Sequence, residues 1–152
     1  MPLAAQVALS ILAHETSSGD LSRTLRATPA NYALTLTDGT GANQAQVVWS
    51  DSRTLAGASE TLNLTSLADT RDGAAVTVTM SAVKSLYARN SGTVTLTFAG
   101  SPFPAGGQAV APGGAVVQCD PTAAGMAASG LTVTGSPGGS YDLVLIGEGT
   151  FT

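Results

Sequence analysis

The chain has 152 residues, of which 11% are charged and 43% are hydrophobic, and its formal net charge is −4. Ordinary soluble domains are about 25% charged, so either hydroxyl and amide side chains solvate this surface or other subunits cover part of it. The six basic residues form no run, which argues against a nucleic-acid partner. The apolar runs are shorter than the roughly 18 residues that a membrane helix needs, which argues against a membrane.

The N-terminal segment, MPLAAQVALSILAHE, is apolar enough to suggest a signal peptide, but it lacks a basic start. Gln6 and Ser10 also interrupt the apolar run, so we predict a strand instead. Ile11 and Leu12 are adjacent and apolar, so both faces of this strand need cover. We therefore expect an N-terminal strand or arm, about residues 1–20, that is available for subunit contacts.

The dominant sequence period beyond this segment is two. Val76, Val78 and Met80 alternate with threonines, and TVTLTF at residues 93–98 repeats the pattern. This alternation is typical of a strand with one face in a core and the other towards water. No window has a convincing helical stripe, although GANQAQVVW and TAAGMAASG are each compatible with one helical turn.

Turns containing Gly and Pro separate the alternating runs. We predict strands at residues 5–14, 21–27, 31–37, 45–50, 60–65, 74–80, 82–89, 93–99, 108–111, 115–119, 130–134 and 141–147. Many short strands with tight turns predict an all-β fold, an antiparallel β-sandwich of jelly-roll type or a barrel, with residues 1–152 as a single domain.

The last predicted strand, YDLVLIG at residues 141–147, is apolar on both faces after Asp142. A strand of this kind is covered on both sides. It is either a central strand overlaid by a loop or a strand whose outer face meets a neighbouring subunit.

The sequence contains no recognisable catalytic, cofactor or metal site. His14 is the single histidine, which removes most Ser-His-Asp, Cys-His and multi-His zinc arrangements. Asp69 and Asp72 lack the spacing of a calcium loop, and we interpret ADTRDG as a solvated turn. Cys119 has no basic neighbour in sequence and is predicted to be a small buried residue. We therefore expect no enzyme and no cofactor.

Four stretches of the chain resemble a family of small structural proteins of tailed bacteriophages. They are DGTGANQAQVVWSDSRTLAGASETLNL (38–64), AVKSLYARN (82–90), APGGAVV (111–117) and YDLVLIG (141–147). The resemblance covers roughly residues 34–147, and the segment between Asn90 and Pro112 is shorter than in that family. The shared pieces are fold elements and contain no catalytic motif.

The resemblance implies a virion component without enzymatic activity, made in the cytoplasm of a bacterial host. Within that class it favours a head decoration (cement) protein. Such a protein is a small sandwich or jelly roll, usually a homotrimer, that binds the major capsid protein on the outer capsid surface and stabilises the shell. A tail or baseplate component is one alternative, and a carbohydrate- or receptor-binding module is another.

Arginine and aromatic residues are over-represented in interface hot spots. On that basis the predicted partner contacts are Trp49, Arg53, Tyr87, Arg89 and Phe103. Each has an alternative role in core packing or in a solvated turn. For Arg53 the alternative is a local ion pair with Asp51, which is worth little if exposed.

Overall fold

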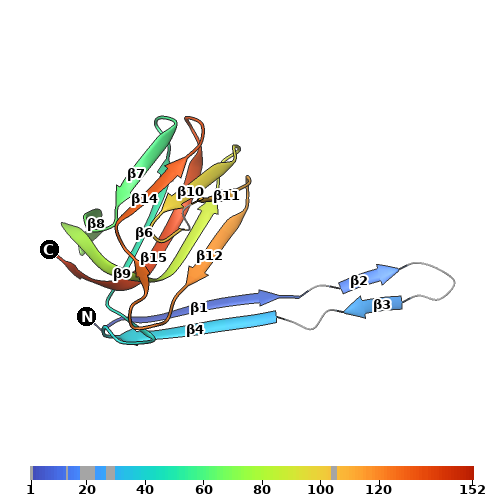
Figure 1. Ribbon diagram of the computed structural model, residues 1–152, viewed down its shortest axis with the longest axis horizontal. Helices are drawn as coiled ribbons and strands as arrows, with labels where there is room; N and C mark the ends of the chain where they lie inside the picture. Colours follow the sequence, from blue (N-terminus) through green and yellow to red (C-terminus); the bar gives the residue numbers. More distant parts are fainter. Residues whose placement is uncertain (1, 13, 18–22, 27–29, 104–105) are drawn as a thin grey trace.

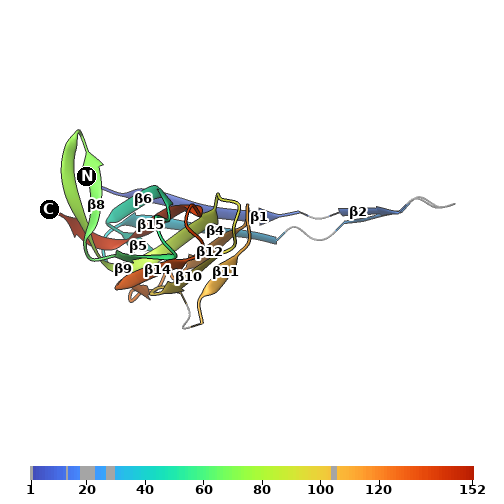
Figure 2. The same cartoon turned by 90° about the horizontal axis from the view of Figure 1, so that it is seen from above.

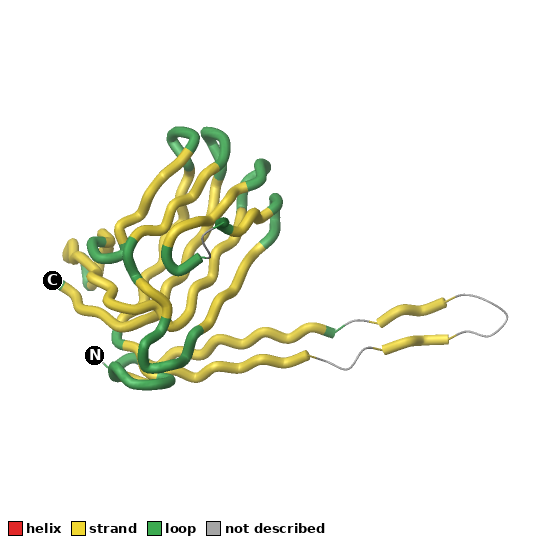
Figure 3. The backbone as a smooth tube through the Cα atoms, in the orientation of Figure 1, coloured by secondary structure: helices red, strands yellow, loops and turns green. Residues whose placement is uncertain are grey.

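The computed structural model describes residues 2–12, 14–17, 23–26, 30–103 and 106–152, and the side chains of all but residues 14–17 and 23–26. These residues form strands and turns, with no helix among them (Figure 3). The prediction of an all-β fold with antiparallel sheets is confirmed.

The larger of two packed sheets is built around two long antiparallel strands, β9 and β15. Its strand order is β12-β9-β15-β6, with β8 and β13 also paired to β9. The strands are β6 (Val47–Thr54), β8 (Leu67–Arg71), β9 (Ala74–Asn90), β12 (Ala115–Cys119), β13 (Met126–Ala127) and β15 (Ser140–Phe151). The two strands predicted at 74–80 and 82–89 are therefore one continuous strand, β9.

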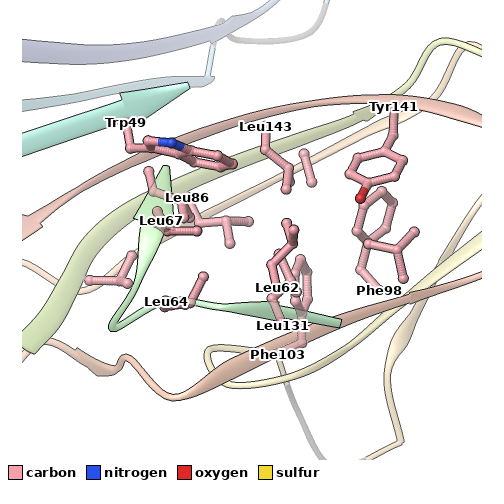
Figure 4. Close-up of a cluster of buried hydrophobic side chains, with 14 of the residues drawn as sticks. Trp49, Leu62, Leu64, Leu67, Leu86, Phe98, Phe103, Leu131, Tyr141 and Leu143 are labelled. Carbon is pink, nitrogen blue, oxygen red and sulfur yellow. The ribbon is translucent and has the colours of Figure 1, made fainter. Parts of the chain in front are cut away.

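The smaller sheet packs face to face on the larger one (Figure 1). In its order β11-β10-β14-β7 the strands are β11 (Gln108–Val110), β10 (Leu96–Gly100), β14 (Gly130–Thr134) and β7 (Ser59–Asn63). Leu86 and Leu143 of the larger sheet meet Phe98 and Leu131 of the smaller one in the core (Figure 4). Within the described residues no strand pairing joins the two sheets, which favours a sandwich over a barrel. The jelly-roll subtype stays a prediction.

Two glycines allow β15 to stay paired with β9 where the register shifts. A Cβ atom on Gly147 would lie 2.0 Å from the carbonyl oxygen of Ala82, and one on Gly149 would lie 2.1 Å from that of Thr79. Both distances are far below van der Waals contact. Only glycine therefore permits this close backbone approach.

The hairpin of β8 and β9 was not predicted. The segment interpreted as a solvated turn, ADTRDG, holds most of β8, and only Asp72 and Gly73, whose φ angles are 50° and 79°, form a two-residue turn. Positive φ at both positions suits a tight hairpin turn, and Asp-Gly is a strong sequence signal for it. The segments considered for a helical turn instead contain β5 (Gln44–Ala45) and β13.

A ribbon lies along the base of the sandwich and continues well beyond it (Figures 1 and 2). Its first part is the antiparallel pair β1 (Ala4–Ile11) and β4 (Ala30–Asp38). The short strand β5 pairs in parallel with the other edge of β4. Farther out, β2 (His14–Ser17) pairs with β3 (Arg23–Arg26). The strands predicted at 5–14 and 21–27 fall on this ribbon, although residues 13, 21, 22 and 27 lie outside the described residues.

Candidate functional site

The β1–β4 part of the ribbon has one apolar face and one polar face. Leu9 lies opposite Tyr32 in the pairing. Because side chains alternate along a strand, the odd-numbered residues of β1 and the even-numbered residues of β4 share this apolar face. On the other face, the hydroxyl of Ser10 donates a hydrogen bond to Oδ1 of Asn31 at 2.7 Å.

The inner half of the apolar face packs on the outer face of the larger sheet. Leu34 and Leu36 are 5% and 0% exposed, and they form a buried cluster with Ala45 and Ile146. The partly buried side chains around this cluster are Leu3, Ala5, Val7, Val48, Cys119 and Val144. The ribbon therefore supplies the cover that the second face of β15 needs. The sequence left two interpretations of β15, a central strand overlaid by a loop or a strand that meets a neighbouring subunit. The strand is central, but a ribbon of the same chain covers it in place of a loop.

The outer half of the same face is not covered by other residues that the structure describes. Leu9, Ile11 and Tyr32 are 45%, 57% and 44% exposed, and Leu12, just beyond β1, is 63% exposed. Neither residues 2–12 nor residues 30–37 include a charged side chain. A contiguous, uncharged apolar strip of this kind is typical of a surface that binds another macromolecule. This outer half, defined by Leu9, Ile11 and Tyr32, is the principal candidate site, and Leu12 at its end faces the opposite side by the same alternation.

Two of the predicted contact residues lie in the core of the sandwich. Trp49 is 3% exposed, and its indole nitrogen donates to the carbonyl oxygen of Ala68 at 3.0 Å. Phe103 is 6% exposed, and its ring centroid lies 5.7 Å from that of Phe98. Their burial removes both from the candidate contacts, because an interior side chain offers no surface to a partner.

Arg53 is held within the chain by two carboxylates. Its guanidinium donates to Asp51 at 2.8 Å and to Glu60 on the opposite sheet, and the Tyr141 hydroxyl donates to the other oxygen of Glu60 at 2.6 Å. The hydrogen bond to Glu60 raises the pKa of Arg53, and the same bond lowers the pKa of Glu60. Burial, followed by the bond to Glu60, raises the pKa of Tyr141. This network ties the two sheets together, which is a structural role.

Tyr87 and Arg89 lie on the outer face of the larger sheet, the face on which the ribbon packs. Tyr87 is half-buried, opposite Val117 of β12 in the pairing, and Val117 is 38% exposed. Arg89 is exposed and lies opposite Asp142 of β15. Of the five predicted residues, these two are placed where a partner could reach them beside the ribbon.

A pocket of about 340 Å³ lies at the end of the molecule where the two termini meet. The pocket is lined by Pro2, Leu3, Gln46, Val48, Arg71, Asp72 and Phe151. Arg71 is fixed at its wall, donating to Asp69 at 3.0 Å and to the carbonyl oxygen of Val48 at 2.6 Å. Its guanidinium carbon lies 4.0 Å from the centroid of the Phe151 ring. The pocket is therefore a mainly apolar hollow whose rim carries the paired Arg71 and the carboxylate of Asp72.

The remaining polar clusters are structural. Lys84 is fully buried, and its ammonium donates to the carbonyl oxygens of Thr122 and Ala123 at 2.5 and 2.8 Å. It also lies 2.9 Å from Oε1 of Glu148, an ion pair outside hydrogen-bond geometry. Cys119 is half-buried rather than fully buried, 3.4 Å from the Ser85 hydroxyl.

The described part of the chain contains no cluster of three or more side chains suited to a metal ion. In the same part, no helix is long and apolar enough to cross a membrane. Comparison with models of protein families, with curated proteins and with solved structures finds no match to this chain. The interpretation of the site therefore depends on its own geometry.

Sequence reasoning predicted the N-terminal arm as a segment for subunit contacts, but it named none of the exposed apolar residues of the ribbon among the individual contact residues. It selected arginine and aromatic side chains, whereas the exposed residues are mostly aliphatic. The signal was present in the adjacent pair Ile11 and Leu12, which requires cover on both faces of one strand. No comparable sequence signal identified Lys84 as a buried cation.

Proposed function

We propose that the chain is a structural protein of a bacteriophage virion, and specifically a capsid decoration (cement) protein that binds the major capsid protein on the outer surface of the shell. The observation that carries the proposal is the uncovered outer half of the ribbon, which projects from a well-packed sandwich. An extended, uncharged, apolar strip suits binding to protein surfaces. It offers no group for turnover of a substrate.

The position of the resembling stretches supports the same proposal. They fall on β5 to β7, on the second half of β9, on the turn into β12 and on β15, which together form the frame of the sandwich. The ribbon lies mostly outside them. In this proposal the sandwich is the frame and the ribbon is the part that contacts the shell.

The mechanism is stabilisation by mass action. A protein that binds the assembled shell, and not its separated subunits, shifts the equilibrium towards assembly. Each apolar side chain of the ribbon that becomes buried contributes roughly 25 cal/mol per Å² of area removed from water. In this proposal the protein is made in the bacterial cytoplasm, acts as a homotrimer on the capsid surface, and needs no cofactor.

Co-sedimentation of the purified chain with shells that lack it, taken from the phage that encodes it, tests this function. We expect saturable binding to shells and none to isolated tails. Ile11→Asp should weaken binding at least about tenfold, whereas Ser10→Asp, on the opposite face of the ribbon, should bind as the unaltered chain does.

Binding to tails alone would assign the chain to the tail or baseplate and overturn the proposal. Binding only to glycans would indicate a receptor-binding module. That alternative has less support from the structure, because Trp49 and Phe103 are buried, and the exposed aromatic residues Tyr32 and Phe151 lie on different strands, β4 and β15.

A further inference from the structure

Four strands lie at the ends of the pairing orders of the two packed sheets, and three of them are protected against a further strand. β6 carries Asp51 and Arg53 and β7 carries Glu60, and these charges pair across that edge of the sandwich. β11 has three residues, and the side chain of Gln108 donates to the carbonyl oxygen of Ala109 at 3.0 Å. Charged side chains and short length both protect an edge strand from pairing with another chain.

The fourth end strand, β12, lacks such protection, and no described strand pairs with its outer edge. Its five residues, AVVQC, include no charge and no proline. Just before β12, Gly114 accepts a backbone hydrogen bond from Asn90 of β9 at 2.9 Å. Just after it, Asp120 donates one to Lys84 of β9, also at 2.9 Å. Because hydrogen-bonded and non-hydrogen-bonded pairs alternate in an antiparallel ladder, every second residue of β12 directs its N–H and C=O groups away from β9. These residues are Ala115, Val117 and Cys119.

The ribbon crosses the outer face of the larger sheet from β6 to β12. The cluster under its inner half includes Val48 of β6, Val144 of β15 and Cys119 of β12. Tyr32, in the outer half, lies beside Cys119, and burial followed by the Cys119 thiol raises the pKa of its hydroxyl. The ribbon therefore leaves the sheet at β12 and projects beyond it on that side (Figures 1 and 2).

A strand added to the outer edge of β12 would extend the larger sheet over the outer half of the ribbon. Neighbouring strands lie about 4.8 Å apart, and two residues along a strand span about 7 Å. One or two added strands therefore match the length of ribbon between Leu9 and Ile11. The outer half would then be covered as the inner half is, by the outer face of a sheet.

We propose that the major capsid protein supplies this cover as an extended segment that pairs with the outer edge of β12 and buries Leu9, Ile11 and Tyr32 under its apolar side chains. A row of free N–H and C=O groups selects an extended backbone as its partner. The segment comes from the shell because the edge adjoins the strip that binds the shell in the proposed function. The inference rests on that function and deepens it by naming the conformation and chemistry of the capsid segment.

Val117→Pro tests the strand pairing in the co-sedimentation assay with shells. Proline removes the N–H that points away from β9 and leaves the hydrogen bonds to β9 in place, and edge strands tolerate proline at such positions. The dissociation constant for shells should rise at least about tenfold. The control Val117→Thr keeps both the N–H and the branched side chain and should bind as the unaltered chain does.

Amide hydrogen exchange of the unaltered chain tests the same contact without any substitution. In the free chain, the outward amides of β12 have no partner strand among the described residues and should exchange rapidly. On binding to shells, a peptide covering residues 115–119 should exchange at least about tenfold more slowly. A peptide from β7, at the opposite edge of the sandwich, is the control and should keep its rate.

Shell binding without protection of β12, or equal affinities of Val117→Pro and Val117→Thr, would overturn the inference and leave the proposed function intact. A dimer of the unaltered chain at about 0.1 mM that Val117→Pro abolishes would assign the edge to a second copy and would also overturn it. Failure of the unaltered chain to bind shells at all would overturn the proposed function, and the inference with it.

Discussion

The inner and outer halves of the β1–β4 ribbon have the same strand pairing and the same alternation, yet their burial differs. Leu36 in the inner half is 0% exposed, and Leu9 in the outer half is 45% exposed. The inner half has the outer face of the larger sheet against it, and the outer half extends beyond that sheet. The comparison teaches that an apolar strand face indicates a need for cover without indicating which molecule provides it.

The largest expected effect is the difference in stability between two variants, one with a leucine truncated in the inner half and one with a leucine truncated in the outer half. Leu36→Ala removes a fully buried side chain and should lower the free energy of unfolding by about 2–5 kcal/mol. Leu9→Ala should change it by less than about 0.5 kcal/mol in dilute, monomeric protein. Urea unfolding of both variants measures the difference. Equal losses would mean that the two halves are not distinct.

A smaller effect is expected from the network that joins the two sheets. Glu60→Gln removes the charge that accepts bonds from Arg53 and Tyr141, and should lower the free energy of unfolding by about 1–3 kcal/mol at pH 7. Thermal unfolding followed by circular dichroism measures it. A variant as stable as the unaltered chain would show that the network contributes nothing net.

The same network predicts a pH dependence of the sandwich. The pKa of Glu60 is lowered in the folded state, so the folded protein binds fewer protons than the unfolded one in mild acid. The stability it contributes is full above the ordinary pKa of 4.5 and is lost as the pH falls through the folded value. The melting temperature should therefore fall between pH 5 and pH 3, and by less in Glu60→Gln. An identical fall in both proteins would contradict this assignment.

The smallest effect is a gradient of amide hydrogen exchange along the ribbon. A two-stranded ribbon without cover is only marginally stable in water. In dilute protein, amides near Tyr32 should therefore exchange at least about tenfold faster than those near Leu36. Mass spectrometry of peptides from β4 provides the measurement. Equal protection along β4 would show that the outer half is stable without a partner.

The sequence predicted most strands because their period-2 alternation reports local geometry. It also predicted that YDLVLIG has two covered faces and that Ile11 and Leu12 both need cover. It did not predict that the ribbon covers YDLVLIG while its own Ile11 and Leu12 stay exposed, because that depends on where the ribbon lies relative to the sheet. Trp49 was misplaced at an interface for a related reason, whereas Arg53 has an intrachain partner, Glu60, that the sequence did not predict, and its role as a partner contact stays a prediction. Their residue types suit interfaces, but the tertiary fold had placed them against Ala68 and Glu60.

The central claim is that the uncovered half of the ribbon binds neighbouring protein subunits on a viral shell. A cryo-EM map of the phage particle that encodes the chain tests it most directly. The account predicts density for the sandwich on the outer capsid lattice, with Leu9, Ile11 and Tyr32 buried against adjacent subunits. Density confined to the tail, or a lattice-bound sandwich whose ribbon projects freely into solvent, would contradict it.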